Sequence, residues 1–165
     1  MSKRSVKQAG GASSDTAADK EIDVFVRRVA EATPIERVAL ERQGVTVSFL
    51  RALAVRLGIS VKRIFEIIGL PHARHERRRG DLHVTGSAGH AALALVDLLS
   101  RAQEIVAQTT SDRAERFDVA KWLGQWIELP QPVLGGRRPA DLIGTPTGVV
   151  VVSRLLGAAV SGTYQ

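Results

Sequence analysis

Residues 45–71 read VTVSFLRALAVRLGISVKRIFEIIGLP, and this stretch decides the fold. Apolar side chains recur every three or four positions over residues 45–57, which predicts a helix that Gly58 can end. Ser60 can cap a second short helix over residues 61–68. Because two short helices joined by a tight turn are typical of a helix-turn-helix, we predict such a unit here.

A basic stretch follows this pair of helices. Residues 62–79 contain six basic side chains against two acidic ones, in a chain whose net charge is +6. In a helix-turn-helix the last helix enters the major groove, where arginines reach guanine edges and neighbouring cations neutralise phosphates. We therefore predict a last helix over residues 72–79, although a solvated helix face would explain the same charges. The candidate DNA contacts are Lys62, Arg63, Arg74, Arg77, Arg78 and Arg79.

A polar tail and two predicted helices precede this unit in the sequence. Residues 1–20 are small, polar and basic with no periodicity, so we predict a disordered tail. Helical spacing begins at Glu21, and Thr33-Pro34 opens another helix that Gly44 closes. The predicted helix-turn-helix domain therefore covers residues 21–82.

Downstream, residues 83–165 also show helical periodicity. We predict a helix over residues 88–108, and a next one capped by Ser111 or Asp112. A loop with proline and glycine and a short turn then precede a helix over residues 145–160. Four consecutive valines in this last segment could form a strand, but their flanking residues favour a helix. The sequence thus predicts an all-α fold.

The composition excludes several classes of function. The chain has no cysteine, and His72 and His75 lack a third ligand, so we predict no disulfide, no metal and no cofactor. No nucleophile elbow or Walker-type loop is present, which predicts no catalytic residue. The first residues lack an apolar signal region, and no apolar run approaches the roughly 20 residues that a membrane helix needs. We expect a cytoplasmic protein.

A more specific pattern occupies the C-terminal part. Its residues are Trp122-Leu123, Pro132-Val133-Leu134-Gly135-Gly136, Pro139, Asp141-Leu142, Thr145, Gly148, Val152, Leu155-Leu156-Gly157 and Gly162-Thr163-Tyr164. This pattern resembles the toxin-binding domain of the Xre/MbcA/ParS-like antitoxins over about residues 115–165. That family carries an Xre-type helix-turn-helix upstream, which implies an Xre-like unit packed with a small helical toxin-binding domain, here over residues 83–165.

The resemblance implies a partner and a role. Partners in the family are commonly RES-domain toxins, which degrade NAD or transfer ADP-ribose, and the antitoxin covers the active site without catalysis. Many members also bind their own promoter. The expected assembly is a homodimer within a hetero-oligomeric complex with the toxin. The candidate toxin-binding residues are Trp126, Leu134, Gly135, Arg137, Arg154, Gly162, Tyr164 and Gln165.

Three of these expectations rest on the chemistry of the residues. Trp122 and Trp126 share a helix face, and we expect Trp122 in the core and Trp126 at the interface. Gly135 and Gly136 are expected to supply positive φ angles in a turn. Tyr164 offers an amphipathic ring suited to a polar nucleotide pocket.

Two alternatives remain at this point. The chain could be a stand-alone helix-turn-helix regulator whose C-terminal half only dimerises it. A small helical enzyme built from distant residues is the other.

Overall fold

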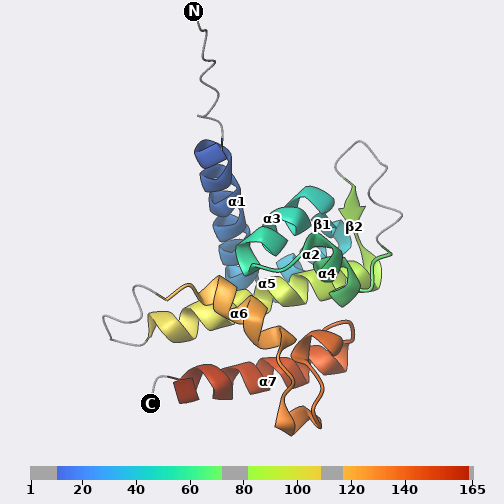
Figure 1. Ribbon diagram of the computed structural model, residues 1–165. Helices are drawn as coiled ribbons and strands as arrows, with labels where there is room; N and C mark the ends of the chain where they lie inside the picture. The colour runs from blue at the N-terminus through green and yellow to red at the C-terminus, as the bar shows by residue number, and fades with distance from the viewer. Residues whose placement is uncertain (1–10, 72–81, 109–116, 164–165) are drawn as a thin grey trace, which may run out of the picture.

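The computed structural model describes residues 11–71, 82–108 and 117–163. This part of the chain is mostly helical, which confirms the predicted all-α class (Figure 1). The helices are α1 (Gly11–Glu31), α2 (Pro34–Gln43), α3 (Val47–Leu57), α4 (Val61–Ile67), α5 (Gly86–Ala107), α6 (Val119–Glu128) and α7 (Pro146–Thr163). Two 3-10 turns, η2 (Pro132–Leu134) and η3 (Pro139–Asp141), and two short strands, β1 (Val45–Thr46) and β2 (His83–Val84), complete the described elements.

Helix α5 lies at the centre of the molecule. Its middle section is apolar on nearly every side, and Leu95, Val96, Leu98 and Leu99 are fully buried. Helices α1, α2, α6 and α7 all contact it. Figure 1 shows α1 and α3 on one side of α5 and α7 on the other. One hydrophobic core therefore extends through both predicted domains, while the domain boundaries themselves stay a prediction.

The pair of helices that the sequence predicted around Gly58 is present. Gly58 ends α3 in the left-handed conformation, with φ of 68°. The Ser60 side chain caps α4 by accepting a hydrogen bond from the Arg63 N–H at 3.1 Å. Ile64 and Phe65 on α4 are buried in the core. The predicted third helix, over residues 72–79, lies outside the described residues.

Helices α3 and α1 begin at other residues than predicted. Helix α3 begins at Val47 because the Thr46 side chain caps it, accepting a hydrogen bond from the Phe49 N–H at 3.1 Å. Residues 45–46 form the strand β1 instead, which pairs antiparallel with β2. Helix α1 begins at Gly11, inside the segment predicted to be disordered. The segment contains several alanines, and alanine has the highest helix propensity of all residue types. In Figure 1 the helix extends beyond the core.

The C-terminal helices agree better with the sequence. Helix α6 starts later than predicted, since Asp118 caps it; the proposed caps Ser111 and Asp112 lie outside the described residues. The valine run is helical, as its flanking residues indicated. Within the described ranges, no helix is both long and apolar enough to cross a membrane.

The crossing of α3 and α6 requires the absence of a side chain at Gly124. A Cβ there would lie 1.9 Å from the Leu57 carbonyl oxygen. We predict that Gly124→Ala lowers the free energy of unfolding by about 1–3 kcal/mol, because the helices must move apart. Urea denaturation measures this change.

The matched control is Gly157→Ala in α7. A Cβ at Gly157 would meet no atom within 4 Å, so this substitution should leave stability unchanged or raise it by up to about 1 kcal/mol through helix propensity. Equal stabilities for the two variants would contradict the close crossing.

Candidate functional site

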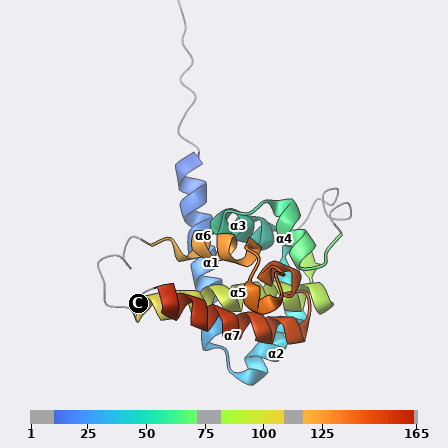
Figure 2. The ribbon, with the colours of Figure 1, turned by 60° about the horizontal axis from the view of Figure 1, so that its bottom comes forward.

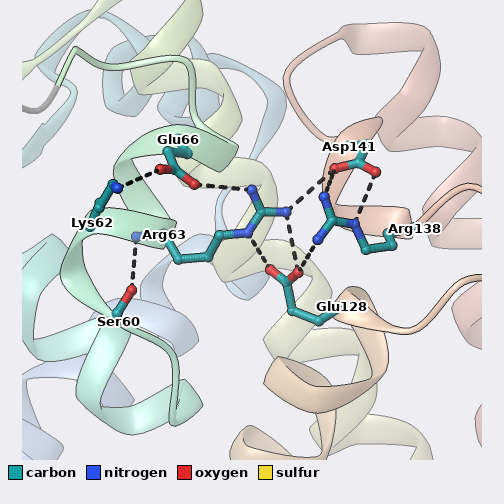
Figure 3. A network of polar contacts seen from close by, with 7 residues as sticks. All are labelled: Ser60, Lys62, Arg63, Glu66, Glu128, Arg138 and Asp141. Atoms are coloured by element: carbon teal, nitrogen blue, oxygen red, sulfur yellow. Dashed lines mark hydrogen bonds and ion pairs between the residues drawn. The ribbon is translucent and has the colours of Figure 1, made fainter.

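Six charged side chains meet where α4, the end of α6 and η3 come together (Figure 3). Three of them are cations and three are carboxylates, so their charges balance. We call this group the Arg63 network. Its members are Lys62, Arg63, Glu66, Glu128, Arg138 and Asp141.

Arg63 is the centre of the network. Its Nε donates to one oxygen of Glu128 at 2.7 Å and its Nη2 to the other at 3.2 Å. The same Nη2 donates to Asp141 at 3.4 Å, and Nη1 donates to Glu66 at 3.3 Å. Paired bonds of this kind are stronger and more directional than single neutral hydrogen bonds. Arg63 therefore joins helix α4 to residues 65 and 78 positions away in the sequence.

Arg138 closes the network into a ring. It donates to Glu128 at 3.2 Å and to both oxygens of Asp141 at 3.0 and 3.1 Å. The Arg63 and Glu128 side chains are only about a quarter exposed, at 23% and 25%. Water and salt therefore screen this pair less than they would screen a fully exposed one.

The network shifts the ionisation of its members. The hydrogen bonds from Arg138 lower the pKa of Asp141, against a smaller opposing effect of burial, and Arg63 lowers it further. The bonds to Glu128 raise the pKa of Arg63 above its already high usual value. Asp141 and Arg63 consequently both stay charged near neutral pH.

The ring lies at the base of the loop over residues 129–138. Across the loop, the Gln131 N–H donates to the Arg137 carbonyl at 3.0 Å, and the Gly136 N–H donates to the Gln131 carbonyl at 3.0 Å. Gly135 and Gly136 have φ of 64° and 79°, which confirms the predicted positive φ angles. The loop exposes Leu129 and Val133 to solvent, the latter at 79%.

Helix α7 presents a second apolar face to solvent. Thr145 caps the helix by accepting from the Gly148 N–H at 3.1 Å. Val152 and Leu156 point into the core, while Val150 and Val151 on the outer side are 50% and 40% exposed. In Figure 2 this helix lies at the front of the molecule. We define the C-terminal surface as the exposed side chains Leu129, Val133, Arg137, Val150, Val151 and Arg154.

The two tryptophans differ from the expectation in how far they are buried. Trp126 is only 7% exposed and belongs to the core, whereas Trp122 is partly buried and packs against the core. Their rings stack with centroids 5.9 Å apart. Trp126 faces inward because it shares a side of α6 with the buried Leu123 and Ile127. Its assignment as a toxin contact stays a prediction.

The other toxin-binding candidates fall into three groups. Leu134, Gly135 and Arg137 lie in the loop, where Leu134 is partly buried and the other two are exposed. Arg154 is exposed on α7, and Gly162 lies near the end of that helix. The predicted residues Tyr164 and Gln165 lie outside the described residues.

The DNA-binding candidates are only partly described. Lys62 is exposed and lies 3.8 Å from Glu66, whereas Arg63 is engaged by three carboxylates. Arg74, Arg77, Arg78 and Arg79 lie outside the described residues, as do His72 and His75. Among the residues that the structure describes, no three potential metal ligands cluster.

The sequence analysis missed the carboxylates of the network. Arg138 and Asp141 are three positions apart, a spacing that often pairs opposite charges within one turn. Glu128 carries no comparable signal, because its partner Arg63 is remote in the sequence.

The lowered pKa of Asp141 predicts a pH dependence of stability. In the unfolded chain an aspartate titrates near about pH 3.9, above its folded value, so the stabilisation is complete above that pH and is lost as the pH falls through the folded pKa. Asp141→Asn should therefore destabilise the protein at pH 7 and by less at pH 3. Denaturant unfolding at both pH values measures the difference. An equal effect at both would contradict the role of the carboxylate charge.

Comparison with known proteins identifies the C-terminal part of the chain. Residues 114–162 match the family described as the antitoxin Xre/MbcA/ParS C-terminal toxin-binding domain. The chain is also similar to the Prs ADP-ribosylating antitoxin of Sphingobium sp. (strain YBL2), with 29% identity over 134 residues that cover 81% of this chain and 83% of the relative. These antitoxins are binders and not enzymes, as the sequence predicted. Residues 114–162 are therefore similar to the Xre/MbcA/ParS C-terminal toxin-binding domain, and most of the chain is similar to an antitoxin.

Proposed function

We propose that this antitoxin binds and inhibits a RES-domain toxin that uses NAD, and that it does so by covering the active site of the toxin. The matched toxin-binding domain and the name of the relative, an ADP-ribosylating antitoxin, support this choice of partner. The observation that carries the proposal is the exposed C-terminal surface, which lies entirely within the matched range.

The composition of this surface suits a protein partner. Half of the valine run of α7 is exposed although the helix has a buried side to accommodate apolar residues. Exposed apolar groups that gather on one part of a protein mark interaction sites, and arginine is enriched at such interfaces. Arg137 and Arg154 provide that residue type on the loop and on α7. Leu129 and Val133 add exposed apolar side chains on the loop.

A charge placed on α7 should disrupt the complex. We predict that Val150→Asp weakens the affinity for the toxin at least about thirtyfold, equivalent to about 2 kcal/mol, because an unpaired carboxylate would become buried. Calorimetry with the toxin encoded next to the antitoxin gene measures the change.

Val24→Asp is the matched control. Val24 is 67% exposed on α1, outside the matched family domain, so its substitution should leave toxin affinity unchanged. Equal losses for the two variants, or none for Val150→Asp, would exclude this surface as the binding site.

The proposal also says how the active site is covered. The C-terminal tail, residues 162–165, would enter the active site of the toxin and block it. We predict that removing residues 162–165 restores NAD turnover by the toxin more than it weakens binding. The C-terminal surface stays intact in the truncated chain, whereas the residues that block the active site are lost. Paired measurements of NAD consumption and of affinity test this. A truncated chain that still inhibits fully would refute the plug.

Autoregulatory binding to operator DNA, a homodimer within the toxin complex and a cytoplasmic location complete the proposal. The α3–α4 pair, the exposed Lys62 and the basic stretch that follows support DNA binding. The alternative is a stand-alone regulator that uses its C-terminal half for dimerisation. Sequence-specific, steeply salt-dependent DNA binding together with no toxin partner would favour that alternative.

A further inference from the structure

Arg63 has the sequence context of a DNA contact, but its side chain reaches towards the C-terminal half (Figure 3). We propose that Arg63 is a positioning residue for toxin binding. From helix α4 it holds the base of the loop over residues 129–138, so that this loop and α7 present one fixed surface to the toxin. This inference rests on the proposed function above.

The two carboxylates that Arg63 binds lie on either side of the loop. Glu128 is the last residue of α6, directly before the loop, and Asp141 ends η3 just after it. Through its three hydrogen bonds to these two carboxylates, a single guanidinium fixes both ends of the loop. The exposed Leu129 and Val133 lie between them and carry part of the C-terminal surface.

Arg63 and Arg138 contact the same carboxylates but differ in what they are attached to. Arg138 is itself the last residue of the loop and moves with it. Arg63 is attached to α4, which the buried Ile64 and Phe65 anchor in the core and which Ser60 caps. Of these two arginines, Arg63 is therefore the one that fixes the loop relative to the core.

The charge balance shows what loss of Arg63 would do. Without it, the carboxylates of Glu66, Glu128 and Asp141 would face Lys62 and Arg138 alone. Arg138 would still bridge Glu128 and Asp141, but no bond would hold these two residues to α4, and the loop would sample other orientations. Affinity falls in proportion to the fraction of molecules that retain the binding orientation.

A matched pair of substitutions tests the proposal. Arg63→Gln and Lys62→Gln each remove one positive charge from α4, but Lys62 contacts only Glu66 within the network, at 3.8 Å. With the full-length antitoxin and the toxin encoded beside its gene, we expect Arg63→Gln to weaken affinity about tenfold and Lys62→Gln less than twofold. Arg63→Lys keeps the charge without the paired bonds and should fall between them.

Amide hydrogen exchange in the free antitoxin separates positioning from general destabilisation. Arg63→Gln should accelerate exchange at Gln131 and Gly136 several-fold, while the amides of Leu95 and Leu98 in α5 exchange as in the wild type. If Arg63→Gln unfolds the chain, Arg63→Lys provides the same comparison with the charge retained.

The outcomes are distinct. A wild-type chain that fails to bind the toxin refutes the proposed function, and this inference falls with it. A wild-type chain that binds, with an Arg63→Gln variant that binds equally well, overturns the inference alone. An Arg63→Gln variant that loses DNA affinity but keeps its toxin affinity would also overturn the inference. That result would indicate that Arg63 contacts DNA, as its position in the basic stretch suggests.

Discussion

The burial of α5 on nearly all sides is the constraint on which the rest of the structure depends. A helix this apolar can exist in water only when other helices cover it, and those helices come from both ends of the sequence. The α3–α4 pair and the C-terminal helices α6 and α7 consequently share one hydrophobic core. Changes that loosen the packing of α1 or α3 should therefore be felt at the C-terminal surface as well.

Helix ends were predictable because local chemistry determines them. Thr33, Ser60 and Gly58 act as caps within one turn of the residues that they serve, so a single stretch of sequence contains the whole interaction. The tryptophans show the limit of such reasoning. Periodicity predicted that Trp122 and Trp126 share a face, but which ring enters the core depends on how α6 rotates against α3 and α5.

The Arg63 network could not be predicted from the sequence for a different reason. Counting charges along the chain assigned Arg63 to a basic segment and suggested a site for phosphate. In three dimensions, carboxylates from α6 and η3 neutralise that charge, and they are 65 and 78 positions away. A basic stretch in the sequence is therefore not always a basic surface. Lys62, one position earlier, lies on the side of α4 away from Glu128 and Asp141, and its side chain is 72% exposed.

The distribution of charge along the chain bears on how the proposed binding of the toxin and of DNA would respond to ionic strength. Residues 80–165 carry seven basic and eight acidic side chains, and the excess positive charge of the chain lies before them. The C-terminal part itself would therefore contribute little long-range attraction, and added salt would change the contacts of this part with the toxin only slightly. A nucleic acid bound through the basic stretch, as proposed, would dissociate steeply as salt rises. With that binding, a rise in salt concentration would release the DNA before the toxin.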